Sequence, residues 1–314
     1  MNTHVLIVGC GAIGGLFAAS LASVAKVTVF DSNAAHVDAI NATGLRIAGK
    51  SPKVLRVEAT SSAAALKGTA FQAIIFLVKS GMTATVLAQL RSVLSGNPVL
   101  VTLQNGMGNI EHLLTLPDAV VAGGATMNAG RYAEPGCVER LIEGKTWLGP
   151  LRGSIDDVRP LAELLNEGGM ETELVSDPMP AVWSKFVFNC IMNPLGALMM
   201  GDNAARYESL EMRTLIDEMA VECMTVVRAL GGSFAFPPME FVDKVRAGTV
   251  PISRHAGSMA LDLERGVPTE IDELTGFVVR EGERLNVPVP ICKTVLRLIK
   301  GLEVAALRRV AKPR

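Results

Sequence analysis

The segment HVLIVGCGAIGGLFAASLA, His4–Ala22, determines the fold class of the N-terminal half. It opens on an unbroken apolar run, Val5–Val8, which is typical of a strand buried on both faces. The run leads into a G-x-G-x-x-G pattern at Gly9–Gly14, after which Leu16 and Leu21 return at roughly helical spacing. This order predicts a buried strand, a glycine-rich turn and a helix.

The position of the glycine pattern predicts a Rossmann domain that binds a dinucleotide. In such a turn the first glycine bends the chain, the second lets the backbone approach a pyrophosphate, and the third lets the helix pack on the strand. The pyrophosphate would lie on the first N–H groups of the helix. We therefore expect cofactor contacts at Gly9, Gly11, Ala12, Ile13 and Gly14. A purely structural glycine turn is the alternative.

An acidic residue ends the second expected strand, Val27–Phe30, and argues against that alternative. Asp31 follows the glycine turn by about twenty residues, where an acid accepts hydrogen bonds from the adenosine ribose. Its charge opposes a 2′-phosphate, so Asp31 favours NADH over NADPH. Alternatively, Asp31 caps the helix expected over 34–42.

Two further expected strands end on polar residues. Phe71–Val78 ends on Lys79, and Val99–Leu103 ends on Gln104, Asn105 and Gly106. Because the carboxyl ends of parallel strands form the ligand crevice of such sheets, we expect Lys79 and Asn105 to bind the cofactor. An Asn-Gly pair also occurs as a simple turn.

The rest of the first half predicts more strands and two helices, the first of them over 82–94. From 119 to 149 the pattern indicates strands appended to the same sheet, partly antiparallel. The other elements are expected at 45–47 and 54–58 (strands), 156–167 (helix) and 171–175 (strand). No strand pattern follows, so we predict an α/β chain with a Rossmann domain over 1–176 and an all-α domain over 177–314.

The second domain opens on a helix from Pro178, with Asp177 as its cap, to near residue 201. Lys185, Asn189 and Asn193 recur every fourth residue, so they share one side of a helix that is otherwise almost entirely apolar. A buried lysine is rare unless it is paired or functional. The alternative is that the asparagines form hydrogen bonds to other helices and that the lysine lies in an exposed stripe on the helix surface.

Proline 194 interrupts the hydrogen bonding of this helix. It leaves the carbonyl of Cys190 without its helical donor and predicts a kink. Further helices are expected over 208–230, 252–265, 269–286 and 291–309, and Ser258 and Asp262 share a face of the second of these. At Thr269–Asp272 a capping box would explain the threonine and Asp272, but it explains Glu270 less well.

Composition excludes several classes of function. The chain has 314 residues, a net charge of −1 and 19% charged residues. This charge balance does not favour binding to nucleic acid or to an anionic membrane. Five scattered cysteines and four isolated histidines predict reduced thiols and no metal site. No apolar run is long enough to span a membrane, and the first strand begins too early for a signal peptide. We expect a cytoplasmic protein, with its oligomeric state, including a homodimer, left open.

In these motifs the chain resembles the ketopantoate reductase family (2-dehydropantoate 2-reductases) over nearly its whole length. The matching residues are G-x-G-A-x-G at 9–14, Lys79-Ser80, Gln104-Asn105-Gly106, K-x-x-x-N-x-x-x-N at 185–193, S-M-x-x-D at 258–262 and T-E-I-D at 269–272. The resemblance implies a Rossmann domain joined to a helical domain. It also implies reduction of a 2-keto acid to the (R)-2-hydroxy acid with NADPH, in the route to pantothenate and coenzyme A.

The same resemblance implies roles for single residues. Lys185 would be the proton donor and Glu270 a substrate-binding acid. The residues that would hold the nicotinamide ribose or the substrate are Asn105, Asn189, Asn193 and Ser258. The family commonly has an arginine for the 2′-phosphate after the second strand, where this chain has Asp31. The cofactor is therefore NADH, or NADPH with Lys79 and Ser32 holding its phosphate.

We expect a nicotinamide-dependent reductase of ketopantoate, a small-molecule 2-keto acid. One alternative is a related NADH-dependent D-2-hydroxyacid dehydrogenase that acts on another branched 2-keto acid. A second is a dinucleotide-sensing protein without catalysis, against which the retention of Lys185 and Glu270 counts.

Overall fold

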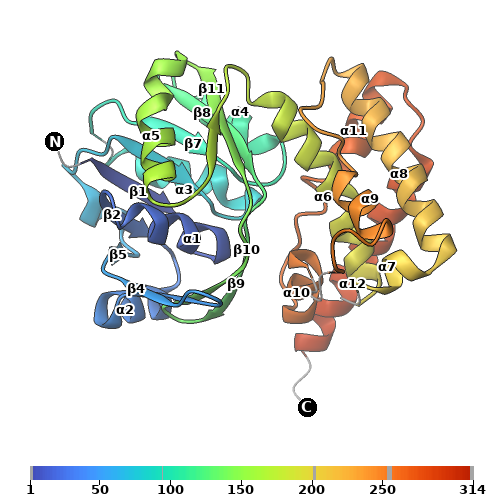
Figure 1. Cartoon of the computed structure of the whole chain (residues 1–314), viewed down its shortest axis with the longest axis horizontal. Coiled ribbons are helices and arrows are strands. Elements are labelled where there is room, and N and C mark those ends of the chain that lie inside the picture. The colour runs from blue at the N-terminus through green and yellow to red at the C-terminus, as the bar shows by residue number, and fades with distance from the viewer. Residues whose placement is uncertain (1–2, 94, 201–202, 253–256, 312–314) are drawn as a thin grey trace. The chain divides into compact units, whose positions relative to one another are not determined.

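The computed structural model describes residues 3–93, 95–200, 203–252 and 257–311. It divides into two compact units, of which unit 1 comprises Met1–Gln104 and Gly108–Pro178. Unit 2 comprises Asn105–Met107 and Met179–Arg314. Figure 1 shows strands in the blue and green part of the chain and only helices in the yellow to red part.

Unit 1 is built on an eight-stranded sheet with the order β12-β11-β8-β7-β6-β1-β2-β5. Its strands are β1 (His4–Val8), β2 (Lys26–Phe30), β5 (Glu58–Thr60), β6 (Ala73–Phe76), β7 (Val99–Thr102), β8 (Val121–Thr126), β11 (Thr146–Arg152) and β12 (Thr172–Leu174). Neighbouring strands are parallel except for β11, which pairs antiparallel with β8. The parallel sheet predicted from the opening segment is confirmed.

The central strand β1 is buried on both faces, as its apolar run predicts. Val5 and Ile7 belong to a core that includes residues of α1 (Ala12–Leu21) and α5 (Ile155–Glu167). Leu6 and Val8 belong to a second core, with residues of α3 (Thr83–Arg91) and α4 (Gly108–Leu114). Successive side chains of a strand point to opposite faces, so one strand supports both cores.

A second sheet corrects the sequence prediction. It has the order β4-β3-β10-β9, with β3 (Leu45–Ala48), β4 (Lys53–Leu55), β9 (Ala129–Glu134) and β10 (Cys137–Ile142). The single strand predicted at 54–58 is replaced by β4 and β5, which lie in different sheets, and the strands between 119 and 149 are shared by both sheets. Helix α1 packs against strands of both. Apolar alternation predicts strands but not their partners, because pairing depends on distant segments.

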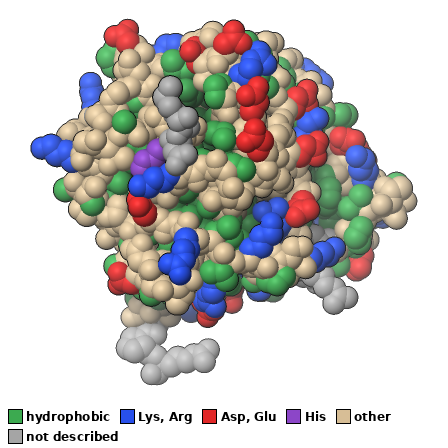
Figure 2. All heavy atoms as spheres, turned by 60° about the vertical axis from the view of Figure 1, so that its left-hand side comes forward, with side chains coloured by type: hydrophobic (Ala, Val, Ile, Leu, Met, Phe, Trp, Pro, Cys, Tyr) green, Lys and Arg blue, Asp and Glu red, His purple; other side chains and the backbone are tan. Residues whose placement is uncertain are grey.

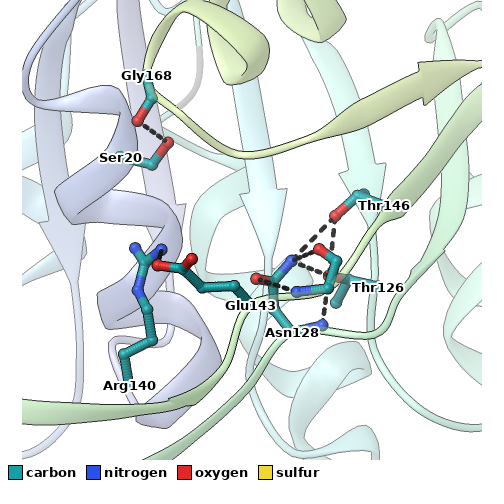
Figure 3. A network of polar contacts seen from close by, with 8 residues as sticks. Ser20, Thr126, Asn128, Arg140, Glu143, Thr146 and Gly168 are labelled. Carbon is teal, nitrogen blue, oxygen red and sulfur yellow. Dashed lines mark hydrogen bonds and ion pairs between the residues drawn. The ribbon is translucent and has the colours of Figure 1, made fainter. Parts of the chain in front are cut away.

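Asn128 fixes the point where the chain leaves the large sheet (Figure 3). Its Nδ2 donates to Thr126 Oγ1 (2.9 Å) and to the Gly144 carbonyl (2.6 Å), and its Oδ1 accepts from the Gly144 N–H (3.2 Å). Thr146 Oγ1 lies 2.8 Å from Thr126 Oγ1. These bonds join the end of β8 to the start of β11, so the β9–β10 hairpin leaves and returns at one place.

Unit 2 has only helices among its described residues, as predicted. They are α6 (Met179–Leu198), α7 (Ala205–Glu208), α8 (Leu210–Ala229), α9 (Glu240–Arg246), α10 (Ser258–Arg265), α11 (Thr275–Leu285) and α12 (Pro290–Ala311). Helix α6 packs against α8, α10, α11 and α12. It lies among helices on several sides, and this explains why most of its residues are apolar.

Several predicted helix ends are wrong. The helix expected over 208–230 begins at Leu210, because the Ser209 side chain caps it. The helix expected from 252 begins at Ser258, and 253–256, which include His255, lie outside the described residues. The first helix of the unit begins one residue after Pro178.

The carbonyl left without a donor by Pro194 has a partner. Helix α6 continues through Pro194 to Leu198, and the Cys190 carbonyl accepts a hydrogen bond of 2.8 Å from Thr275 Oγ1. Thr275 is fully buried at the start of α11. The lost helical bond is therefore replaced by a bond to another helix, in accord with the rule that buried carbonyls are paired.

The described residues include neither a membrane-spanning helix nor a cluster of metal ligands. No helix among them is both long and apolar enough to cross a membrane, and no group of metal-ligating side chains among them could hold an ion. On the face drawn in Figure 2, acidic and basic side chains are scattered in both signs. That face offers no large basic patch of the kind that binds nucleic acid.

Candidate active site

The glycine turn of unit 1 has two glycines that the fold requires and one that it does not. Gly9 has a φ of +91°, and a Cβ there would lie 2.7 Å from the Val78 nitrogen. A Cβ on Gly14 would lie 1.8 Å from the Gly9 carbonyl oxygen. Gly11 is exposed and has no atom near its Cβ position. The open space at Gly11 is therefore available to a ligand.

The neighbouring helix end suits an anion. Helix α1 begins at Ala12, and its first turn contains no acidic residue. Free N–H groups and the helix dipole at such an end attract phosphate. The turn thus fits the pyrophosphate of a dinucleotide, and the residues that would hold it are Gly9, Gly11, Ala12, Ile13 and Gly14.

Asp31 is held beside this turn by two backbone groups. Its Oδ2 accepts from the Cys10 N–H (2.7 Å) and its Oδ1 from the Asn33 N–H (2.8 Å). The helix α2 (Ala34–Thr43) is capped by Asn33, whose side chain accepts from the His36 N–H. The alternative that Asp31 caps this helix is therefore wrong, because Asn33 stands nearer to the helix start.

Polar side chains beneath the ends of β6 and β7 form a connected network in unit 1. Gln104 Nε2 donates to the Val78 carbonyl (2.7 Å) and to Thr83 Oγ1 (2.8 Å). Asn109 lies 2.7 Å from Thr83 through its Oδ1 and donates from Nδ2 to Ser80 Oγ (3.0 Å). Lys79 follows β6 with an exposed side chain. Thr83 and Asn109 could not be predicted from the sequence, because periodicity carries no signal for such a network.

Unit 2 brings three of the predicted residues into one hydrogen-bonded chain. Asn105 follows β7 in the sequence but groups with the helices of unit 2. Its Oδ1 accepts from Asn189 Nδ2 on α6 (3.0 Å), and its Nδ2 lies 3.5 Å from Glu270 Oε2. Asn189 is buried, and its use of Asn105 explains how a polar side chain is accommodated on an apolar helix.

Lys185 lies on α6 one turn before Asn189 and is partly buried. Burial lowers its pKa to about 8, and the opposing influence of the Glu270 carboxylate raises it by less. An ammonium with a pKa of about 8 is mostly protonated at pH 7, yet it gives up its proton far more readily than an exposed lysine. The group is thus suited to donate a proton near neutral pH.

The Thr269–Asp272 segment corrects the predicted capping box. Thr269 donates to Glu303 Oε1 from its N–H (2.8 Å) and its hydroxyl (2.7 Å), and Asp272 pairs with Lys300. The helix expected from 269 begins at Thr275. Glu270 therefore lies in a turn held against α12, not in the first turn of a helix, so no helix dipole acts on it there.

Two predicted residues lie apart from this hydrogen-bonded chain. Asn193 is partly buried on the next turn of α6 after Asn189. Ser258 is exposed as the first residue of α10, a helix that packs against α6. Within the described part of the chain, no hydrogen bond joins either residue to Lys185.

Comparison with known proteins gives one consistent result. The sequence profile described as "Ketopantoate reductase PanE/ApbA" matches residues 5–153, and that described as "Ketopantoate reductase PanE/ApbA C terminal" matches 177–303. The 2-dehydropantoate 2-reductase of Pyrococcus horikoshii is 30% identical over 300 residues, covering 95% of this chain and 97% of that one. The enzyme of the same name from Halobacterium salinarum is 31% identical over 302 residues, covering 95% and 98%.

Solved structures agree with these matches. The PanE/ApbA family ketopantoate reductase of Ralstonia eutropha superimposes with a TM-score of 0.86 at 28% identity, covering 97% of this chain and 99% of that one. D-mandelate dehydrogenase, solved with NADH and anilino(oxo)acetate, has a TM-score of 0.88 over 97% and 99% of the two chains. At 22% identity the latter shows a shared fold only. Members of this family use a nicotinamide dinucleotide, which the glycine turn of unit 1 fits. The chain belongs to the ketopantoate reductase family.

Proposed function

We propose that this chain reduces 2-dehydropantoate (ketopantoate) to (R)-pantoate with a reduced nicotinamide dinucleotide. In this proposal, residues 1–176 bind the dinucleotide and residues 177–314 bind the keto acid. The observation that carries it is the placement of Lys185, partly buried and with a lowered pKa, on the same helix as Asn189, which is hydrogen-bonded through Asn105 to Glu270. Family membership supports the substrate.

A nicotinamide dinucleotide, when bound, would supply the hydride for the carbonyl carbon of the keto acid. In this proposal the Lys185 ammonium stabilises the negative charge that builds on the ketone oxygen, and its Nζ then passes a proton to that oxygen. An ammonium in a partly desolvated site stabilises the negatively charged transition state more than it stabilises the neutral ground state. Such selective stabilisation of the transition state is the condition for catalysis. Lys185 is thus the proposed general acid.

Glu270 is the proposed partner of the substrate's terminal hydroxyl. Asn105 accepts a hydrogen bond from Asn189 and faces the Glu270 carboxylate with its amide nitrogen, so the orientation of the three side chains is coupled. A carboxylate held in this way can accept a hydrogen bond from a hydroxyl group. Asn193 and Ser258 are proposed to make the remaining polar contacts with the substrate or with the nicotinamide ribose.

For the cofactor we propose a preference for NADH. Both oxygens of Asp31 accept backbone N–H bonds, so turning the carboxylate away from a 2′-phosphate would break two charge-assisted hydrogen bonds. At an effective dielectric of about 20, like charges about 4 Å apart cost several kcal/mol. Lys79 and Ser32 can offset part of this cost, so we expect a preference and not an exclusion.

A panel of 2-keto acids assayed with both reduced cofactors tests the proposal. Ketopantoate should give the highest kcat/KM, and 2-ketoisovalerate, which lacks the terminal hydroxyl, a clearly lower one. Equal activity on the two acids would favour an NADH-dependent D-2-hydroxyacid dehydrogenase. Asp31 is compatible with this alternative too, because it favours NADH. Dinucleotide binding without turnover of any acid would favour a sensing protein.

A further inference from the structure

His36 is a buried histidine that the proposed reaction does not use. It lies on α2 with 1% of its surface exposed. The Gly136 N–H donates to its Nδ1 (2.9 Å), so Nδ1 must carry a lone pair. The proton of the neutral ring is therefore on Nε2, which donates to the Cys10 carbonyl at 2.9 Å. The structure thus defines both the charge and the tautomer of this ring.

The residue that His36 binds is the centre of the glycine turn. Cys10 lies between Gly9 and Gly11, and its side chain is fully buried. Its carbonyl is held by His36, and its N–H is held by Asp31 at 2.7 Å. Glycine has the widest backbone freedom of any residue, and Cys10 has one on each side. Asp31 and His36 thus hold the two backbone groups of the residue between these glycines.

We propose that His36 is a positioning residue of the dinucleotide-binding turn, and that its protonation weakens dinucleotide binding in acid. A second ring proton would lie on Nδ1, where it would face the Gly136 N–H. That hydrogen bond would be lost, and the ring would move away from the hairpin that joins β9 and β10. The Cys10 carbonyl would lose a partner whose position depends on this hairpin.

The groups around His36 set the direction of this pH effect. Burial lowers the pKa of His36 below its usual value, and the nearby Asp31 carboxylate opposes that shift without cancelling it. The other facing groups are the Cys10 thiol, whose pKa burial raises, and Tyr132, whose ring centre lies 5.1 Å from that of His36. Since the folded-state pKa is depressed, the contribution of His36 is complete above about pH 6.5 and is lost as the pH falls through the folded-state value.

Calorimetric titration of the full chain with NAD⁺ at pH 5 to 8 tests the proposal. NAD⁺ is used because it survives acid and needs no keto acid, so the result does not depend on the proposed substrate. We expect the wild-type Kd to weaken by about fivefold, the effect of losing one hydrogen bond, as the pH falls through the pKa of His36. His36→Gln should bind more weakly at pH 7.5 and lose this pH dependence.

His4 offers a matched control in the same sheet. It lies at the start of β1, the opposite end from the glycine turn, and its Nε2 is 2.9 Å from Thr28 Oγ1. Burial also lowers its pKa. His4→Gln should keep both the affinity of the wild type and its pH dependence. A histidine with a purely structural role would change the melting temperature but not the pH profile of Kd.

Ring NMR of the wild type keeps the proposal testable if His36→Gln fails to fold. The spectra should show the Nε2–H tautomer and a pKa that coincides with the midpoint of the affinity loss. A wild-type Kd that stays constant while the NMR signals of His36 show that its ring becomes protonated, or a His36→Gln variant with wild-type pH dependence, would overturn the proposal.

Discussion

Two regions of this protein hold polar groups in place by different means. The glycine turn of unit 1 is held by side chains that bind backbone groups, as Asp31 and His36 do at Cys10. The Lys185 region of unit 2 is held by side chains that bind one another, as in the Asn189–Asn105 pair. A residue that is bound through its backbone groups can be substituted without loss of those hydrogen bonds if the backbone keeps its conformation. A hydrogen bond between two side chains is lost when either residue is replaced.

The difference also separates what each region does. The first region fits the binding of a cofactor, and the second contains Lys185, a partly buried lysine whose pKa is lowered to about 8 by burial. Variants of the two regions should therefore have separable effects. Changes in unit 2 should act on kcat and on keto acid selection, and changes at the turn should act on the dinucleotide.

Replacement of Lys185 should have the largest effect. Lys185→Ala removes the proposed proton donor, and we expect kcat to fall at least about a hundredfold, the usual scale for lost acid catalysis. The Kd for the dinucleotide should change little. Steady-state kinetics and a binding titration measure the two quantities. A variant with near-normal kcat would show that Lys185 is not the proton donor. It would also contradict the proposed separation of function between the two regions.

The pH profile of the wild type should report the same group. Because burial lowers the pKa of Lys185 to about 8, the protonated donor is lost as the pH rises through this value. We expect kcat/KM to be level below pH 8 and to fall by about tenfold for each further pH unit. Lys185→Arg, which stays protonated, should lack this alkaline limb. A level wild-type profile up to pH 10 would contradict the assignment.

Replacement of Glu270 should distinguish two substrates. If Glu270 binds the terminal hydroxyl, Glu270→Ala should lower kcat/KM for ketopantoate more than for 2-ketoisovalerate. The difference should correspond to about 1–3 kcal/mol, the cost of an unpaired polar group. Glu283→Ala, which removes an exposed acid of α11, serves as the control. Equal losses on both acids would indicate that Glu270 orients Lys185 instead.

The cofactor preference should depend on the turn region. We expect a higher kcat/KM with NADH than with NADPH in the wild type, and a shift toward NADPH in Asp31→Ala combined with Ser32→Arg. The change removes a negative charge and adds a positive one where a 2′-phosphate would lie. Asp38→Ala, which removes an exposed acid of α2, should leave the preference unchanged. A wild type at least tenfold more active with NADPH would refute this prediction.

The smallest effect concerns stability alone. Thr275→Val removes the hydroxyl that binds the Cys190 carbonyl, and we expect a loss of about 1 kcal/mol in the free energy of unfolding. Thr294→Val is the matched control, because Thr294 is exposed and binds a carbonyl of its own helix. Chemical denaturation compares the two variants. Equal values would mean that the Cys190 carbonyl does not need this partner.

The sequence predicted much of the first region because its requirements are local. A positive φ at Gly9 and the contact of Gly14 with the Gly9 carbonyl both demand glycine, so residue type reports backbone geometry. Asp31 lies 21 residues from its partner Cys10, within one strand–helix–strand unit. The role of His36 at this turn was not predicted, because its hydrogen-bond partner Gly136 lies 100 residues away in the sequence.

The second region was predicted only in part. Helical spacing placed Lys185, Asn189 and Asn193 on one side of α6, and the proline rule identified the Cys190 carbonyl as lacking a donor. The partners that satisfy these groups lie far away in the chain, as Asn105 lies 84 residues from Asn189. The expected capping box at Thr269 failed for the same reason, because Glu303 takes both donors of that threonine.

The α/β class, the glycine turn, the helical second half and the polar side of α6 were predictable because each follows from periodicity or from backbone limits of single residues. The second sheet of β3, β4, β9 and β10, and the grouping of Asn105 with the helices of unit 2, were not predictable in this way. Strand pairing and hydrogen bonds between distant side chains depend on which segments the core brings together. Those choices are made by packing of the whole chain and leave no local pattern.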